Sequence, residues 1–99
     1  MKSSFSDIIN SEKPVLLDFH ADWCGPCKIL SPILKQVKNE LGNSIKIVKI
    51  DVDKNQTLAE KYQVRGVPTM ILFKKGRLLW RQSGVLQKHE IISTINSYS

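Results

Sequence analysis

The chain contains two cysteines, Cys24 and Cys27, which lie three positions apart in the segment HADWCGPCKIL at residues 20–30. Such a pair can bind a metal, form a static disulfide or carry out thiol–disulfide exchange. A structural zinc site needs four ligands, and the only histidines, His20 and His89, are expected at a strand end and in a distant helix. A disulfide that closes so short a loop would constrain the unfolded chain little. The spacing therefore favours a reactive pair.

Cys24 is expected at the point where a strand gives way to a long helix. A thiol at a helix N-terminus faces unpaired backbone N–H groups and the positive end of the helix dipole, and both favour the nucleophilic thiolate. Pro26 suits the first helical turn because a proline there loses no hydrogen bond. Cys27 lies one turn further on the same face, within reach of a mixed disulfide on Cys24. We therefore expect Cys24 to attack and Cys27 to release the product.

Asp18 lies inside the apolar segment VLLDF at residues 15–19. A carboxylate in a central strand is costly, and desolvation would raise its pKa. It is interpreted either as the proton acceptor for Cys27 during release or as a carboxylate at the exposed end of the strand. His20 faces the same side of the strand. Its imidazole either tunes the dithiol near physiological pH or fills space, uncharged, beneath the helix.

Two further positions could form a contact surface. Trp23 is either a core aromatic or an exposed side chain, and its place directly before Cys24 favours exposure. In RGVPTM, residues 65–70, Pro68 comes directly before a strand and cannot donate to the ladder. A cis bond there would leave the backbone of Val67 free to pair with an extended peptide. From the residues alone, an ordinary trans proline is the favoured interpretation.

The rest of the sequence predicts the elements that position these residues. The pattern predicts a short helix capped by Ser3 or Ser4, and a long helix with a kink at Pro32 that stops at Gly42. The expected helices cover residues 4–11, 24–41, 57–62 and 88–98; the expected strands cover 14–19, 45–51, 69–73 and 77–83, with Gly84 ending the last one. The apolar positions of the long helix are Ile29, Leu30, Ile33, Leu34, Val37 and Leu41. This order predicts an α/β domain over residues 1–99, with one sheet between helices.

Composition excludes several function classes. Of the 99 residues, 41% are hydrophobic and 24% charged, as in an ordinary soluble protein. The start of the sequence has no apolar run of signal-peptide length, and no later stretch could span a bilayer. We therefore expect no membrane association and a cytoplasmic location, where stable disulfides are rare. The net charge is +6, but the basic residues are scattered, and aromatic residues do not interleave with them. Solvated charge is therefore favoured over a nucleic-acid surface. The one basic cluster surrounds an expected turn and comprises Lys74, Lys75, Arg77 and Arg81.

Taken together, these residues resemble the thioredoxin family from about Ser4 to the C-terminus. WCGPCK at residues 23–28 matches the family's active-site motif in full. Further matches fall at the family's characteristic positions: Asp18, Pro32, Lys49, Pro68, Gly76 and Gly84. The resemblance implies a thioredoxin fold, with a central mixed four-stranded sheet flanked by helices on both faces. It also implies a redox-active disulfide, with no metal and no bound cofactor.

The resemblance also implies roles for individual residues. Cys24 would be the exposed nucleophile, Cys27 the resolving thiol, and Asp18 a buried acid/base that Lys49 tunes. Pro68 would be cis, in contrast to the interpretation from the residues alone. Contacts to substrate would come from Trp23, Gly25, Pro26, Gly66, Val67, Pro68 and Gly84. Electrons would come from NADPH through a flavin-containing thioredoxin reductase.

The expected function is that of a cytoplasmic protein disulfide reductase acting on disulfide-containing proteins. The alternative is a non-catalytic assembly subunit that uses the same fold. A thiol oxidant or isomerase is less favoured, because Gly-Pro between the cysteines resembles the reducing members of the family.

Two features depart from the family pattern. His20 stands where these proteins usually have an aromatic residue, often tryptophan. The family also opens with a strand that pairs with the counterpart of residues 45–51, and the chain begins at the helix that follows. Residues 45–51 should therefore form an edge strand. We expect Lys46 to be the main charge that opposes pairing of this edge with other chains, and Lys49 to point toward Asp18. We expect a monomer that associates weakly through this edge at high concentration.

Overall fold

Residues 4–98 are described by the computed structural model of the chain. The elements, in chain order, are α1 (Phe5–Ile9), β1 (Val15–His20), α2 (Gly25–Leu41), a 3-10 turn (Gly42–Ser44), β2 (Lys46–Asp51), α3 (Gln56–Lys61), β3 (Thr69–Lys74), β4 (Arg77–Ser83) and α4 (Lys88–Ser97). Each predicted helix and strand is present, with ends that differ by a residue or two. Ser4 caps α1 through its hydroxyl, whereas the other cap candidate, Ser3, lies outside the described residues.

The strands form one mixed sheet in the order β2-β1-β3-β4. β1 pairs in parallel with β2, so that Asp18 lies opposite Lys49. β3 pairs antiparallel with both β1 and β4. The predicted four-stranded mixed sheet is therefore confirmed. Within the described part of the chain, no strand pairs with the outer side of β2, which forms one edge of the sheet.

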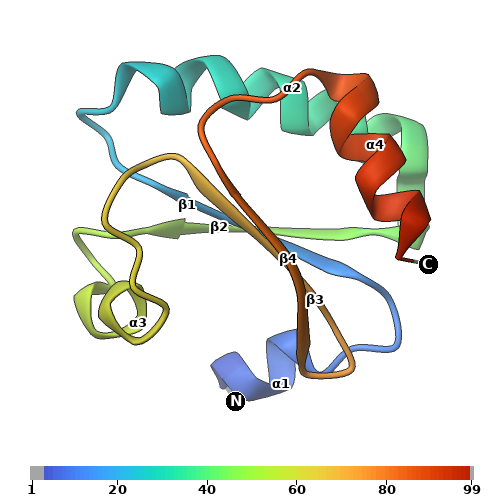
Figure 1. The fold of residues 1–99 in the computed structure, drawn as a ribbon, viewed down its shortest axis with the longest axis horizontal. Helices are drawn as coiled ribbons and strands as arrows, with labels where there is room; N and C mark the ends of the chain where they lie inside the picture. Colours follow the sequence, from blue (N-terminus) through green and yellow to red (C-terminus); the bar gives the residue numbers. More distant parts are fainter. Residues whose placement is uncertain (1–3, 99) are drawn as a thin grey trace.

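The helices form two layers, with α2 and α4 on one face of the sheet and α1 and α3 on the other (Figure 1). The alternation of side chains along β1 serves both layers. Leu16 packs toward α2 and α4, whereas Val15, Leu17 and Phe19 belong to the cluster that includes residues of α1 and α3. Asp18 shares the parity of Leu16, so it lies on the α2 face. The near-continuous apolar run of β1 thus reflects burial on both faces.

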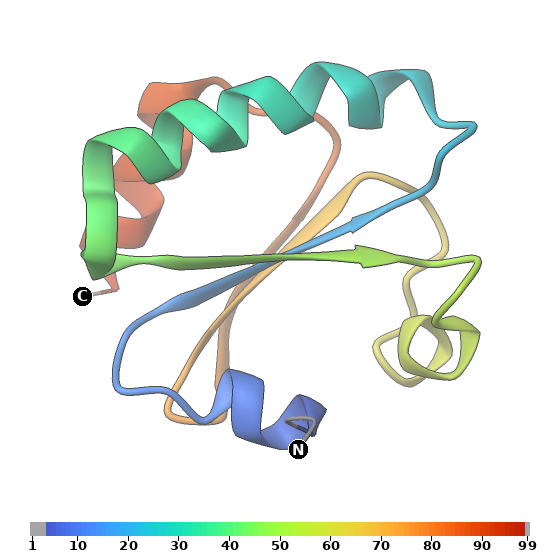
Figure 2. The same ribbon diagram turned by 180° about the vertical axis from the view of Figure 1, so that it is seen from behind.

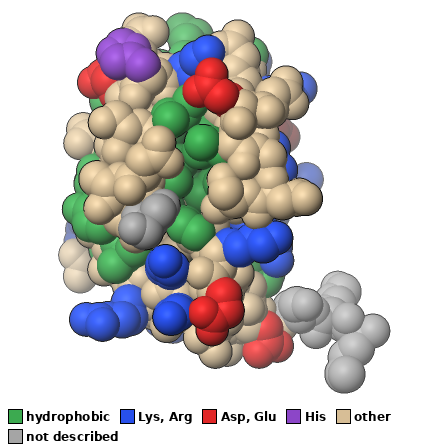
Figure 3. Space-filling view, turned by 90° about the vertical axis from the view of Figure 1, so that its right-hand side faces the viewer, with side chains coloured by type: hydrophobic (Ala, Val, Ile, Leu, Met, Phe, Trp, Pro, Cys, Tyr) green, Lys and Arg blue, Asp and Glu red, His purple; other side chains and the backbone are tan. Residues whose placement is uncertain are grey.

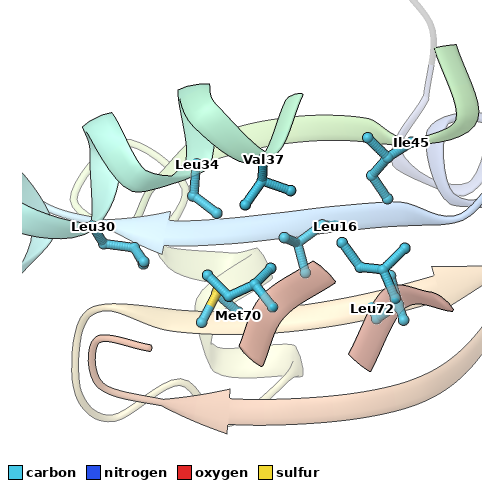
Figure 4. Close-up of a cluster of buried hydrophobic side chains, with 9 residues drawn as sticks. Leu16, Leu30, Leu34, Val37, Ile45, Met70 and Leu72 are labelled. Atoms are coloured by element: carbon cyan, nitrogen blue, oxygen red, sulfur yellow. The ribbon is translucent and has the colours of Figure 1, made fainter. Parts of the chain in front are cut away.

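The core under α2 holds the helix in place above the sheet (Figure 4). Leu30, Leu34 and Val37 descend from α2 onto Leu16 and its neighbours in β3, Met70 and Leu72. Ile29 is 60% exposed, so its predicted place on the apolar face of α2 is wrong. It lies next to Leu30 in the sequence, a rotation of about 100° around the helix, which turns it to solvent. Pro32 lies inside α2 without ending the helix.

The β3–β4 turn contacts the end of α1 and the segment that follows it. Backbone N–H groups of Lys75 and Gly76 donate to the carbonyl oxygens of Ser11 and Ile9, at 2.9 and 3.0 Å.

Arg81 does not join the predicted basic cluster at this turn, because its guanidinium donates to the carbonyl oxygens of Tyr62 and Gln63. On the face shown in Figure 3, Lys and Arg side chains lie close to Asp and Glu side chains. The positive charge there is not a patch of one sign.

Candidate active site

Cys24 and Cys27 form a disulfide at the start of α2, with their Cα atoms 5.3 Å apart. Cys24 is the N-cap residue of the helix, as the sequence predicts, and its Sγ accepts a hydrogen bond of 3.1 Å from the Cys27 backbone N–H. Pro26 occupies the first turn, where its missing N–H costs nothing. The Cys24 sulfur therefore faces the positive end of the helix dipole, which favours the thiolate once the bond is reduced.

The two cysteines are both largely covered in this disulfide form. Cys24 is 3% exposed and Cys27 is 5% exposed, so the exposure expected of Cys24 is not observed. The pair packs with Ala21, and the side chains of Val52 and Val67 lie against this cluster. A short side chain at a helix cap is easily covered by the loops beside it. In this form, only a small part of either cysteine is therefore accessible to an incoming group.

The loop before β3 lies directly beside the disulfide. The Val67–Pro68 peptide bond is cis, as the family resemblance implies and contrary to the interpretation from the residues alone. The Val67 carbonyl oxygen lies 3.6 Å from Cys24 Sγ. The Gly84 N–H donates to the Pro68 carbonyl oxygen at 2.9 Å, and the Thr69 hydroxyl donates to the Gly66 carbonyl oxygen at 2.7 Å. Four predicted contact residues, Gly66 to Pro68 and Gly84, therefore come together near the cysteines.

Trp23 extends the contact surface on the other side of Cys24. Its side chain is 70% exposed, which excludes the core interpretation, and its Nε1–H donates to Asp53 at 2.9 Å. A shallow groove of about 80 Å³ is lined by Trp23, Val52, Val64, Arg65, Gly66 and Val67. Gly25 and Pro26, which follow Cys24 in the chain, are also exposed. Sequence reasoning missed Asp53 and Arg65, because nothing local in their segments links them to Trp23.

Asp18 lies beneath the start of α2 and is only 1% exposed, so its alternative placement at an exposed strand end is wrong. Neither carboxyl oxygen has a hydrogen-bond partner among the described residues. Burial raises the pKa of Asp18 above its ordinary value, and the positive charges of Lys49 and His20 oppose this rise in part. A carboxyl group in this position can hold a proton at a pH where an exposed aspartate cannot.

Lys49 and His20, whose charges act on Asp18, line a hollow together with Cys27. The hollow has a volume of about 190 Å³ and is lined by His20, Ala21, Asp22, Cys27, Lys28, Ser31 and Lys49. Lys49 does not hydrogen-bond to Asp18; its Nζ donates instead to the Ser31 hydroxyl at 2.7 Å. Sequence reasoning missed Ser31, whose only signal is its position one helical turn after Cys27. Water in this hollow can reach Cys27, His20 and Lys49 together.

Residues 4–98 include no group of three or more His, Cys, Asp or Glu side chains placed to hold a metal ion. Within the same range, every helix is too short or too polar to span a bilayer. The site thus consists of a disulfide at a helix end, a buried carboxyl group behind it and an exposed groove in front. This arrangement suits the transfer of a disulfide bond between two proteins.

Comparisons with known proteins agree with this geometry. The thioredoxin family model matches residues 1–97. Chloroplastic thioredoxin Y of Oryza sativa is 46% identical over 96 residues, covering 96% of this chain and 57% of the rice protein. A thioredoxin-like protein of Synechocystis is 42% identical over 97 residues, covering 97% of this chain and 92% of its own length. A mutant thioredoxin from Halobacterium salinarum superimposes with a TM-score of 0.85 at 40% identity, covering 94% of this chain and 80% of that one.

The chain is shorter than some of these relatives. It spans 57% of the rice protein and 58% of chloroplastic thioredoxin Y2 of Arabidopsis thaliana.

Proposed function

The chain belongs to the thioredoxin family, and from that premise we propose that it is a protein disulfide reductase that works by dithiol–disulfide exchange. The observation that carries the proposal is the Cys24–Cys27 disulfide at the N-terminus of α2, with the Val67 carbonyl oxygen 3.6 Å from Cys24 Sγ. A binding subunit needs neither the dithiol nor a carboxyl group buried behind it.

In the first step, the Cys24 thiolate of the reduced protein attacks one sulfur of a substrate disulfide. The Cys24–substrate S–S bond forms, the substrate S–S bond breaks, and the second substrate sulfur leaves as a thiolate that takes a proton from water. The groove beside Trp23 and Val67 would hold the substrate chain in an extended form. Gly66 and Gly84 would let it approach closely because they carry no side chain.

In the second step, Cys27 attacks Cys24 Sγ. The Cys27 thiol gives its proton to the Asp18 carboxylate, the internal disulfide forms, and the substrate leaves as its second thiolate. Two electrons have then passed from the dithiol to the substrate. Lys49 and His20 line the same hollow as Cys27, and their positive charges would lower the pKa of Asp18 against the effect of burial. They would thereby set the fraction of Asp18 that is ionised and able to accept the proton.

We propose that a flavin-containing thioredoxin reductase restores the dithiol with electrons from NADPH, and that disulfide-containing proteins are the substrates. Both partners follow from the family alone. The cytoplasmic location stays a prediction that rests on the sequence, and the relatives include proteins named as chloroplastic.

Reduction of insulin by dithiothreitol tests the proposal. We expect the chain to accelerate the reaction, and Cys24→Ser to abolish the acceleration because no nucleophile remains. Cys27→Ser should instead accumulate a mixed disulfide on Cys24 that non-reducing electrophoresis detects. If the unaltered chain gives no acceleration, the assembly-subunit alternative is favoured.

A further inference from the structure

A second hollow lies between α2 and the edge strand β2, outside the groove that faces the disulfide. Its volume is about 450 Å³, and it is lined by Ser31, Leu34, Lys35, Lys38, Ile47 and Lys49. Leu34 is buried and Ile47 half-buried, so the floor is apolar. Three lysines stand around this floor, and no acidic residue is among the lining residues. Figure 2 shows the position, with β2 in front of the sheet and α2 above it.

The backbone of β2 is open on the same side. The N–H groups of Lys46 and Val52 donate to Pro14 and His20 on the β1 side, at 3.0 and 2.9 Å. Because residues of a parallel strand alternate in the direction of their backbone groups, the N–H and C=O groups of Ile47 and Lys49 point outward. No other described residue hydrogen-bonds to these outward groups.

The outward carbonyl groups at the two ends of β2 already have partners. Lys38 Nζ donates to the Ile45 carbonyl oxygen at 2.7 Å, and Asn55 Nδ2 donates to the Asp51 carbonyl oxygen at 2.9 Å. The open stretch is therefore the centre of the strand, at Ile47 and Lys49. Two residues spaced in this way match the alternate hydrogen bonding of one added strand.

We propose that this edge binds an extended, acidic segment of a partner protein, which adds to β2 as a fifth strand. Backbone hydrogen bonds to Ile47 and Lys49 would hold the segment in register. Its carboxylates on the α2 side would meet the ammonium groups of Lys35, Lys38 and Lys49, and its apolar side chains would lie on the other face, beside Val48. The hollow supplies room for side chains of the segment above Ile47.

The charges argue for this partner over a second copy of the chain. Pairing of two β2 strands would bring the same lysines of both copies together, and like charges at a strand interface are destabilising. The net charge of +6 adds to the repulsion. An acidic strand avoids this repulsion, and its carboxylates are attracted to the same lysines. We therefore favour an acidic partner over the expected self-association through this edge.

The probe is a capped peptide of about seven residues with alternating glutamate and valine, which is long enough to cover the strand. It is titrated into the oxidised protein, and amide hydrogen exchange is followed by NMR. We expect slower exchange at Ile47 and Lys49, and binding that weakens as salt rises. A peptide with lysine in place of glutamate should bind about tenfold more weakly or worse. A glutamate peptide methylated on alternate backbone nitrogens should not protect these amides.

Two variants distinguish binding at the hollow between α2 and β2 from attraction by the net charge of the protein. Lys35→Glu and Arg77→Glu each replace one positive charge by a negative one, so each takes the net charge from +6 to +4. Lys35 lines the hollow between α2 and β2, whereas Arg77 lies on β4 at the opposite edge of the sheet. We expect Lys35→Glu to weaken peptide binding about fivefold or more and Arg77→Glu to change it less than about twofold.

Three results would overturn the proposal. The first is equal weakening by both variants, which would mean that only net charge attracts the peptide. The second is protection of β4 amides in place of Ile47 and Lys49. The third is a dimer in sedimentation without peptide, with these two amides already protected, which would identify a second copy as the occupant. None of these measurements depends on disulfide reduction.

Discussion

Asp18 is the residue at which stability and chemistry compete. It is buried, its carboxyl oxygens have no hydrogen-bond partner among the described residues, and burial raises its pKa. The folded protein therefore holds this proton at pH values where the unfolded chain, with a pKa near 3.8, has released it. The contribution of Asp18 to stability is greatest below that value and falls as pH rises through the folded-state pKa.

Asp18→Asn should therefore stabilise the fold at neutral pH by about 1–3 kcal/mol, because it removes a buried ionisable group whose carboxylate form has no hydrogen-bond partner. The difference in free energy of unfolding should grow as pH rises from about 3.8 and level off above the folded-state pKa. Urea unfolding at a series of pH values measures it. A difference that stays constant across this range would show that Asp18 does not titrate as described.

The same variant should slow turnover. Without the carboxylate, the Cys27 thiol loses its proposed proton acceptor, and we expect resolution of the mixed disulfide to slow by about tenfold to a hundredfold at neutral pH. Turnover at saturating reductant, together with the amount of trapped mixed disulfide, measures this effect. Full activity in Asp18→Asn would remove the proposed role.

His20 stands on the face of β1 that also carries Asp18, and it is half-buried in the hollow that reaches Cys27. If its imidazole tunes the site, both His20→Trp and His20→Gln should flatten the pH profile of reduction between about 5.5 and 8. The glutamine variant separates loss of the imidazole from the added bulk of tryptophan, since it keeps a polar side chain of similar size in the hollow. Profiles unchanged in both variants would leave His20 as a space-filling residue.

At the scale of elements, α2 joins the site to the sheet edge. Lys38 Nζ donates to the carbonyl oxygens of Gly42 and Ile45, at 2.9 and 2.7 Å, where the helix turns toward β2. A lysine near the C-terminus of a helix can satisfy carbonyl groups that the helix leaves unpaired. This contact fixes the start of β2 against the end of α2.

Lys38→Ala should therefore destabilise the protein by about 0.5–1.5 kcal/mol, since two carbonyl groups lose a charged donor. Lys35→Ala, one turn earlier on the same helix, should change the free energy of unfolding by less than about 0.5 kcal/mol, because Lys35 is exposed and its side chain hydrogen-bonds to no described residue. Urea denaturation of both variants compares them directly. Equal losses would mean that the carbonyl contacts contribute nothing measurable.

The elements themselves were predictable because their signals are local. Buried strands such as VLLDF, the turn at Lys75 and Gly76, and the cap at Cys24 each depend on a few neighbouring residues. The motif also placed the disulfide. Contacts between distant segments were not predictable, as with Lys49 and Ser31 or Trp23 and Asp53. Apolar periodicity likewise marked Ile29 for the core, since it cannot tell the edge of a buried stripe from its centre.

At the scale of the whole molecule, two apolar clusters on opposite faces of the sheet hold the layers together. Leu16 lies at the centre of the cluster under α2 and is fully buried. Leu16→Ala should cost about 2–5 kcal/mol, from lost apolar burial and the cavity left behind. Leu78→Ala, at an exposed position on β4, is the control and should cost less than about 1 kcal/mol. Thermal unfolding of both variants checks the difference.

The two described ends of the chain lie away from the disulfide. Figure 1 shows the start of α2 at the upper left, the N-terminal end at the bottom beside the β3–β4 turn, and the C-terminal end at the right after α4. An attachment at either end would therefore leave the groove beside Trp23 unobstructed. Tethered to a solid support through either end of the chain, the protein should keep its cysteines accessible to solution. The fold is suited to use as a reusable surface reagent, and insulin reduction by the tethered protein should match that in solution.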